Sequence, residues 1–356
     1  MSETVVRRTI QIAELPAPTG REQGRAELVR SWWESDGLDD VRTDHVGNVW
    51  GRVREGTGSV VIVCAHLDTV FGDDVAHTVR VQGDTLVGPS VGDDSVGLAA
   101  LSAVGPVLPA GRIGVWVLAT VGEEGLGNLA GVNAALDHAP GSVAALIAVE
   151  GNYLGRVSTV GVGSVRRRVL LRGPGGHAWE SADAPSAIHE LSRLVTSIVD
   201  LDRPSGTTLN VGRLGGGEGI NMRAREAWCE LDLRGDDPER LASLAREVNA
   251  YVAGVGPGFI VEQEDLGDRP AGRIDAEHPL VLAAQQALGE LGTPAVSPPT
   301  STDANAAHVR GVPAIAVGIT TGSGEHTTSE WIDTGPIDGG VRTLARTIEL
   351  FEELSA

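Results

Sequence analysis

The chain of 356 residues contains no lysine, and all 28 of its basic residues are arginine. Mechanisms that need a lysine amine, such as Schiff-base catalysis or a P-loop phosphate site, are therefore excluded. Acidic residues number 48, which gives a formal net charge of −20. A surface of this sign repels the phosphates of nucleic acids and of anionic lipids, so we expect neither as a partner.

Long apolar runs are also missing. No stretch of about 18 apolar residues occurs, so no membrane span is expected. Residues 1–8 lack the apolar segment of a secretory signal. The only two cysteines, Cys64 and Cys229, are far apart and lie in apolar or strand-like runs. We therefore expect two buried free thiols rather than a disulfide, which indicates a cytoplasmic location.

Short, continuous apolar runs are present and alternate with helix-compatible stretches. Such runs are typical of strands that are buried on both faces of a sheet. The predicted core strands are 59–65, 113–121, 143–149 and 314–319, with two further strands at 41–44 and 49–53. The predicted helices are 5–15, 21–36, 95–105, 128–138, 278–292 and 336–354. This alternation predicts an α/β domain with a mostly parallel sheet.

Between residues 160 and 270 the pattern changes to the order β-α-β-β-α-β. The predicted strands there are 166–172, 207–214, 222–233 and 258–264, and the predicted helices are 184–200 and 238–255. This order matches a ferredoxin-like split βαβ unit. Because it interrupts the segments of the first sheet, we predict an inserted domain at 160–270. The domain that it interrupts would consist of residues 1–159 and 271–356.

Polar residues of metal-binding type follow each of the four core strands. They are His66 and Asp68, Glu123 and Glu124, Glu150, and Glu325 with His326. In open α/β sheets, ligands bind at the carboxyl ends of the strands. The glycine-punctuated turn 88–97 adds the neighbouring carboxylates Asp93 and Asp94, which repel each other unless a cation lies between them or one turns away. Two histidines with several carboxylates form a mixed N/O donor set, which suits Zn²⁺ and tolerates Mn²⁺ or Co²⁺.

Each of these signals also has a purely structural interpretation. The Asp pair before Ser95 is typical of an acidic N-cap that opens a helix, and a Glu pair often begins a helix. Asp68 suits an Asx turn, Glu150 suits a loop cap, and a single histidine at a strand end is ordinary. The joint pattern, with every group placed after an apolar strand, favours one shared metal site.

The sequence contains a series of motifs by which it resembles the co-catalytic zinc peptidases and amidohydrolases. This family includes aminoacylase, acetylornithine deacetylase, succinyl-diaminopimelate desuccinylase, glutamate carboxypeptidase and peptidase T. The resemblance covers nearly the whole chain, including the inserted domain. The motifs are His66-Leu67-Asp68-Thr69-Val70, Gly92-Asp93-Asp94, Gly122-Glu123-Glu124-Gly125, Glu150, Gly176-His177-Ala178, Asn221, Asp232-Leu233-Arg234, and Ser301-Thr302-Asp303-Ala304-Asn305 followed by His326.

The resemblance implies two bound divalent metal ions, with zinc as the first choice. Their ligands would be His66, Asp93, Glu124, Glu150 and His326. Asp93 would bridge the two ions, and its peptide bond to Asp94 would be cis. Glu123 would act as the general base, and Asp68 would hold the His66 ring from behind.

The resemblance also assigns roles within the inserted domain, which would act as a lid and as the dimer interface of a homodimer. His177 would donate to the oxyanion in the partner subunit's site, while Asn221 and Arg234 would bind the substrate. An exposed loop histidine and a solvent-facing arginine remain the alternatives. Trp179 would either narrow the specificity or pack within the lid, and 322–324 would either offer N–H groups to a carboxylate or form a flexible turn.

One departure from the family is Ser95, which stands where many members carry lysine. The predicted activity is hydrolysis of an amide bond next to a free carboxylate or amine. The substrate would be a dipeptide, a tripeptide or an N-acyl amino acid. The alternatives are an aminopeptidase of the related single-domain zinc class, a non-catalytic relative that binds metal or a small ligand, and a scaffold that uses only its lid interface.

Overall fold

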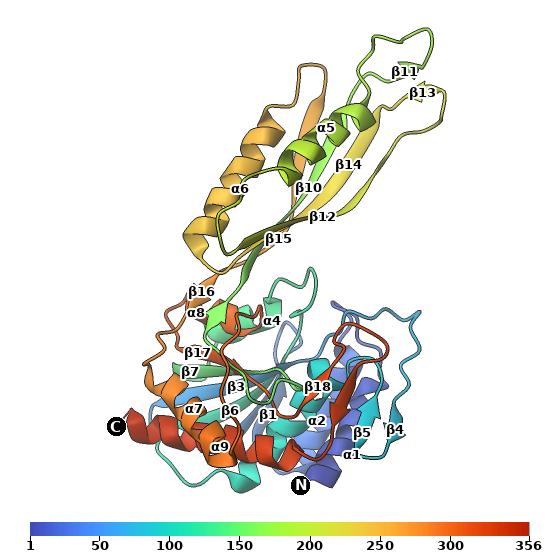
Figure 1. Cartoon of the computed structure of the whole chain (residues 1–356). Coiled ribbons are helices and arrows are strands. Elements are labelled where there is room, and N and C mark those ends of the chain that lie inside the picture. Colours follow the sequence, from blue (N-terminus) through green and yellow to red (C-terminus); the bar gives the residue numbers. More distant parts are fainter. Residues whose placement is uncertain (356) are drawn as a thin grey trace. The chain divides into compact units, whose positions relative to one another are not determined.

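The computed structural model of the chain describes residues 1–355 (Figure 1). It divides into two compact units. The first unit combines Met1–Gly161 with the chain from Arg273 onward, and the second is Val162–Gly272. Within the described residues, no helix is both long enough and apolar enough to cross a membrane.

A seven-stranded sheet forms the centre of the first unit, in the order β1-β2-β6-β3-β7-β17-β8. The strands are β1 (Asp39–Thr43), β2 (Val49–Arg54), β3 (Ser59–His66), β6 (Gly114–Thr120), β7 (Ser142–Val149), β8 (Val157–Ser158) and β17 (Ala314–Val317). The four central strands β6, β3, β7 and β17 are parallel, whereas β1, β2 and β8 pair antiparallel. The predicted α/β class with a mostly parallel sheet is confirmed.

Helices cover both faces of this sheet, which explains why its central strands are apolar throughout. One face packs against α1 (Ser2–Ala13), α2 (Gln23–Ser35), α3 (Gly97–Leu101), α7 (Pro279–Leu291) and α9 (Ile337–Leu354). The other face packs against α4 (Ala130–Asp137) and α8 (Ala304–His308). Alternate residues of β3 therefore enter two different cores: Val61 and Val63 one, Ile62 and Cys64 the other.

Two parts of the first unit differ from the predicted elements. The helix predicted at 95–105 consists of η1 (Val91–Val96), the short α3, and the 3₁₀ turn η2 (Ser102–Val107). The regular α-helix covers only Gly97–Leu101, because η1 with its non-helical Asp93 and Asp94 precedes it and the 3₁₀ turn with Pro106 follows it. A small sheet in the order β18-β19-β5-β4 was not predicted. Its strands are β4 (Arg80–Gln82), β5 (Thr85–Val87), β18 (Gly322–Ser323) and β19 (Trp331–Asp333).

The second unit follows the order β-α-β-β-α-β. Its main elements are β10 (Gly163–Arg172), α5 (Ala187–Val199), β12 (Thr207–Gly216), β14 (Glu226–Gly235), α6 (Pro238–Ala253) and β15 (Ile260–Arg269). The sheet is antiparallel in the order β12-β14-β10-β15, and its apolar face packs against both helices. Asp237 caps α6 by accepting from the N–H groups of Glu239 and Arg240, with Pro238 at the first helical position.

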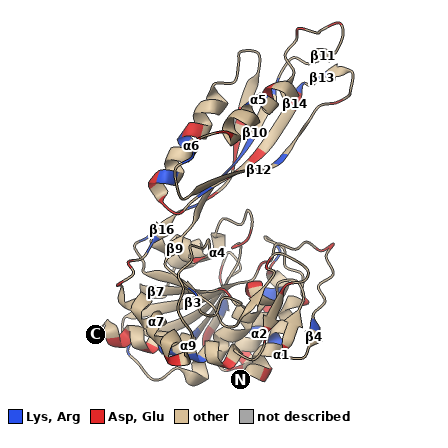
Figure 2. Ribbon diagram, viewed as in Figure 1, with Lys and Arg blue, Asp and Glu red and all other residues tan. Residues whose placement is uncertain are grey.

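One strand predicted in this unit is wrong in its extent. The stretch 222–233 contains two strands, β13 (Met222–Arg223) and the main strand β14. β13 pairs with β11 (Gly176–His177) in a separate two-stranded ladder, away from the main sheet. Two further short strands, β9 (Val160–Gly161) and β16 (Gly272–Arg273), lie in the connecting segments. Acidic and basic residues are interspersed on both units in the view of Figure 2.

Candidate metal centre

The carboxyl ends of the parallel strands bring polar side chains to one edge of the main sheet. His66 is the last residue of β3, and Glu123 and Glu124 follow β6. Glu150 comes directly after β7. Because β6, β3 and β7 are parallel neighbours, the residues that follow them meet at the same edge.

Three sets of side chains converge there, with their potential ligand atoms all within 4.8 Å of one another. The sets are His66–Asp93–Glu150, Asp93–Glu124–His326 and His66–Glu123–Glu124. The five residues predicted as ligands are thus brought together, and the predicted base Glu123 adjoins them. Asp93 belongs to two of the sets, which is the arrangement expected of a carboxylate between two cations.

The His66 ring has an oxygen atom against each of its two nitrogens. Nδ1 lies 3.0 Å from the carbonyl oxygen of Asp68, and Nε2 lies 2.8 Å from Oδ1 of Asp93. Burial opposes a charge on this ring, but the nearby carboxylates of Asp68 and Asp93 hold the pKa of His66 well above its usual value. A neutral ring has only one N–H, so Nε2 needs either a second proton or a metal ion. This geometry fits a metal site.

His326 approaches the same carboxylates from the more exposed side. Its Nε2 lies 3.2 Å from Oδ2 of Asp93 and 3.2 Å from Oε1 of Glu124. These two hydrogen bonds raise the pKa of His326 to about 10. Burial would raise the pKa of Asp93, but the bonds from His326 and His66 hold it well below its usual range. The ionised Asp93 therefore lies between two imidazoles.

Two further carboxyl groups lie deeper in the site. Burial raises the pKa of Glu150 and of Asp94 well above the usual carboxyl value, and Asp93 adds like-charge repulsion to both. Buried carboxylates at this density need compensating cations. Two imidazoles with several carboxylates form a donor set that suits Zn²⁺, Mn²⁺ or Co²⁺.

The predicted cis peptide bond between Asp93 and Asp94 is confirmed. The two side chains have different surroundings. Asp93 faces the histidines, whereas Asp94 accepts hydrogen bonds from the backbone N–H of His66 at 3.2 Å and of Gly151 at 2.9 Å. Asp94 thus ties together the loops that carry two candidate ligands. Ser95, which replaces the lysine of many relatives, is fully buried.

Asp68 contributes in two ways. The hydrogen-bond partner of His66 Nδ1 is the main-chain carbonyl of Asp68, because the Asp68 carboxylate is 3.6 Å from that nitrogen. The carboxylate itself accepts from the N–H of Glu123 at 3.0 Å and of Glu124 at 2.8 Å. The hydroxyl of Thr19 donates to it as well, at 2.8 Å. Asp68 therefore fixes the backbone of the predicted base and of one candidate ligand.

Glu330 belongs to the site but was not among the predicted residues. It is fully buried on the loop before β19, and its Oε1 accepts from the N–H groups of Gly92 at 2.8 Å and Asp93 at 2.7 Å. Burial and the charge of Asp93 raise the pKa of Glu330 to about 8. No local motif marks Glu330, because its partners lie 238 and 237 residues earlier in the chain.

The remaining predicted residues lie in the second unit and divide into two groups. His177 is exposed on β11, and the N–H of Ala178 donates to the carbonyl of Asn221 at 2.9 Å, so these two predicted residues are close neighbours. Arg234 lies near the other end of β14, where its Nε donates to Asp232 at 2.9 Å. Trp179 is 86% exposed, so the packing alternative for it is wrong.

The environment of His177 selects its tautomer. Its Nδ1 accepts from the backbone N–H of Trp179 at 3.2 Å, with Glu180 at 3.4 Å. A neutral ring whose Nδ1 accepts must carry its proton on Nε2. His177 therefore presents an N–H donor at Nε2.

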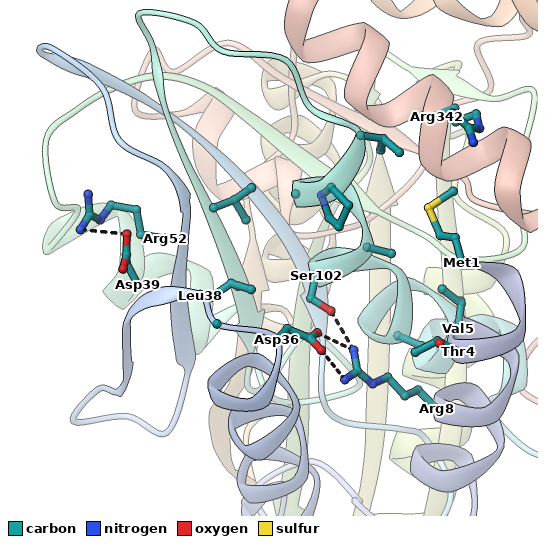
Figure 3. Close-up of a pocket in the computed structure, with 17 residues that line it drawn as sticks. Met1, Thr4, Val5, Arg8, Asp36, Leu38, Asp39, Arg52, Ser102 and Arg342 are labelled. Carbon is teal, nitrogen blue, oxygen red and sulfur yellow. Dashed lines mark hydrogen bonds and ion pairs between the residues drawn. The ribbon is translucent and has the colours of Figure 1, made fainter.

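A separate cavity of about 600 Å³ lies in the first unit (Figure 3). It is lined by residues of α1, β2, η2 and α9, and it contains none of the predicted site residues. Arg8 lies in its wall and donates to Asp36 and Ser102. This cavity contains none of the converging sets of potential ligands, so the candidate site remains the residue cluster at the edge of the main sheet.

Comparisons with known proteins identify the fold and the family of the chain. The chain is 24% identical to the uncharacterised protein YqjE of Bacillus subtilis, over 97% of this chain and 96% of that protein. It is 36% identical to a Pyrococcus abyssi protein described as a LysW-lysine/LysW-ornithine hydrolase, over only 26% of each chain. A tripeptidase of Staphylococcus aureus has the same fold, with a TM-score of 0.82, 21% identity and 99% coverage of both chains. Residues 62–350 match the model of peptidase family M20/M25/M40, which confirms the predicted family resemblance, and the chain belongs to this family.

Proposed function

We propose that this protein is a hydrolase that uses two divalent metal ions to cleave an amide bond in a short peptide or an N-acyl amino acid. The ligands are His66, Asp93, Glu124, Glu150 and His326, and the preferred metal is zinc, with Mn²⁺ or Co²⁺ tolerated. The observation that carries the proposal is the membership of Asp93 in two converging sets of potential ligands.

The metals and the residues around them have different roles in the proposed reaction. When bound, the metals supply a water of lowered pKa and polarise the scissile carbonyl. Glu123 takes the water proton on its carboxylate and delivers it to the nitrogen of the leaving amine, a role worth roughly 10²–10⁴ in rate. Asp68 accepts from the N–H of Glu123 and thereby fixes the position of this base.

In this proposal the second unit is a ferredoxin-like lid that also forms a homodimer. His177 donates its Nε2–H to the oxyanion, and Asn221 and Arg234 bind the substrate. His177 pairs with Met222 of β13 at the tip of the second unit (Figure 1), whereas Arg234 lies near the end of β14, eight residues after its first residue Glu226. At about 3.3 Å per residue, β14 spans about 26 Å from Glu226 to Arg234, several times the length of a dipeptide. One lid therefore cannot present both residues to one substrate, which supports a dimer in which His177 serves the partner's site.

The relatives support small amide substrates, because the Staphylococcus aureus protein of the same fold is a tripeptidase. The second unit argues against the single-domain aminopeptidase alternative, since its tip carries the donor His177. The two cysteines are free and buried, which supports a location in the reducing cytoplasm.

The proposal is tested by loading the protein with Zn²⁺, Mn²⁺ or Co²⁺ and screening dipeptides, tripeptides and N-acyl amino acids for released amine. Glu123→Gln should lower turnover by roughly 10²–10⁴, while the metal content stays near two per chain. Glu55→Gln, at a side chain that is 85% exposed, is the matched control and should be silent. Unchanged turnover in the Glu123 variant would remove this residue from the mechanism. A wild-type protein that binds no metal, or binds metal and cleaves nothing, would contradict the proposed activity.

A further inference from the structure

The segment Ala17–Arg25, between α1 and the first turns of α2, contacts the loops that carry the candidate ligands. Thr19 donates to Asp68 at 2.8 Å and to the carbonyl of Glu124 at 3.3 Å. Glu22, which is buried, accepts from the N–H of Gly122 at 3.2 Å. None of these contacts involves a ligand atom, so the segment acts on the site through the backbone and through Asp68.

Arg25 makes the most extensive of these contacts. Its side chain is completely buried, and each guanidinium nitrogen has a different partner. Nε donates to the carbonyl of Leu15 at 2.9 Å, and Nη1 donates to the carbonyl of Leu67 at 3.2 Å. Nη2 donates to the hydroxyl of Ser90 at 2.9 Å. The guanidinium therefore joins three segments that are distant in the sequence.

Two of these segments are parts of the metal site. Leu67 lies between His66 and Asp68, and Ser90 opens the turn that carries Asp93. Ser90 is held in the left-handed backbone region with a φ of 54°, which its side-chain contact helps to stabilise. Arg25 thus connects the loop of one candidate ligand to the turn of the candidate bridging ligand.

The charge of Arg25 is balanced only at a distance. Within residues 1–355, no carboxylate lies in ion-pair contact with its guanidinium, and its three acceptors are uncharged. Burial lowers the pKa of Arg25 to about 10, opposed by the charges of Asp68 and Asp94, so it stays protonated at neutral pH. A buried charge costs free energy, and only its hydrogen bonds and these more distant charges offset it.

We propose that Arg25 is a positioning residue of the metal centre, which holds the His66–Asp68 loop and the Asp93 turn in register before metal binds. This role rests on the metal site of the proposed function. Two possible roles of the cation predict opposite effects on metal affinity. A cation that acted only through its charge would repel divalent ions, so its removal would tighten metal binding. A residue that preorganises the ligands has the opposite effect, because its removal leaves the metal to order the loops.

The test uses the full chain and Zn²⁺ as the probe. Arg25→Gln removes the charge and the planar fork, and Arg25→Lys keeps only the charge. We expect Arg25→Gln to weaken zinc binding about 10–100-fold in a competition assay with a chelating indicator, as for other residues that orient metal ligands. Arg25→Lys should lie between this variant and the wild type. For a substrate found in the screen, kcat should fall while KM stays near the wild-type value.

The matched control is Arg8→Gln. Arg8 is another buried arginine of the first unit, with its own bonds to Asp36 at 2.6 and 2.8 Å and to Ser102 at 3.0 Å (Figure 3). Its loss should lower the unfolding midpoint in urea without changing zinc affinity. If Arg25→Gln does not fold, Ser90→Ala removes a single acceptor and should still weaken zinc binding by a smaller factor.

The possible outcomes separate this inference from the proposed function. If the wild type binds no metal, the proposed function fails. If the wild type binds zinc and the Arg25 variants bind it equally well or more tightly, only the positioning role of Arg25 is overturned. Equal losses of zinc affinity in Arg25→Gln and Arg8→Gln would also overturn it, since a general loss of stability would then explain both.

Discussion

Replacing Asp68 by asparagine should test how strongly the residues behind the metal ligands hold them in place. The buried carboxylate accepts three hydrogen bonds, from the N–H groups of Glu123 and Glu124 and from the hydroxyl of Thr19. In Asp68→Asn one acceptor oxygen becomes an NH₂ group. The least disruptive orientation places it against the N–H of Glu123, because only one bond is lost there.

The expected cost follows from that orientation. Losing one hydrogen bond to a charged group costs about 1.5–3 kcal/mol, and leaving a buried N–H without an acceptor costs about 1–3 kcal/mol more. We therefore expect the metal-free protein to lose about 3–5 kcal/mol of unfolding free energy, measured by urea titration with a chelator present. Thr19→Ala removes one hydrogen bond to the same carboxylate but leaves no buried N–H without an acceptor, so it should cost only about 1.5–3 kcal/mol. A loss below about 1 kcal/mol for Asp68→Asn, or equal losses for both variants, would refute this account.

Three further predictions address the metals, the pH dependence and the packing. Removing metal with a chelator should lower the unfolding temperature and abolish hydrolysis, and added Zn²⁺ should restore both. Free Zn²⁺ at about 1,000 times its Kd should stabilise the folded protein by about 4 kcal/mol. Burial lowers the pKa of His308 to about 4, so between pH 6.5 and pH 4 the unfolded chain binds more protons than the folded chain. The free energy of unfolding should therefore decrease as the pH is lowered from 6.5 to 4, and His308→Gln should make this part of the pH–stability curve flatter. Gly340→Ala should destabilise the fold by roughly 3 kcal/mol or more, because a Cβ there would lie 1.8 Å from the carbonyl oxygen of Ile319. The control is Gly289→Ala in α7, where a Cβ would meet nothing within 4 Å, and this change should stabilise the fold by about 0.5–1 kcal/mol.

The sequence predicted the structure best where burial on both faces of the sheet requires apolar residues throughout a strand. Strands buried on both faces must be apolar throughout, so β3, β6 and β7 were visible as continuous runs. The first polar residues had to come at the ends of these runs, which is why His66, Glu124 and Glu150 could be assigned to a common edge from the sequence alone. Parallel pairing of neighbouring strands then follows from the helices between them.

Regular elements that depend on backbone detail were predicted less well. The helix expected at 95–105 is a regular α-helix only over Gly97–Leu101, because the chain then tightens into a 3₁₀ turn that contains Pro106, and the apolar pattern of 98–101 carries no sign of this. The strand expected at 222–233 is interrupted because Met222 pairs with His177 in a separate ladder. The two-residue and three-residue strands of the small sheet are too short to show an alternating pattern.

Two of the residues that hold the ligands in place, Arg25 and Glu330, were not predictable either. Arg25 and Glu330 contact the Asp93 turn from 65 and 238 residues away in the chain. A buried arginine on a helix looks the same in sequence as a solvated one, because the difference lies in which loops the fold brings against it. These supporting contacts become visible only when the backbone path is known.

The entry and exit of the second unit lie side by side. Ser164 at the start of β10 pairs with Arg269 at the end of β15, and a Cβ on Gly163 would lie 2.4 Å from the backbone nitrogen of Ala271. The candidate metal pocket, by contrast, draws every one of its side chains from the first unit. We therefore expect that the insertion can be excised between Gly163 and Ala271 and replaced by a few residues. If the proposed function is correct, such a trimmed chain should still bind the ions but lack His177, which would separate the binding of the ions from the cleavage of the amide.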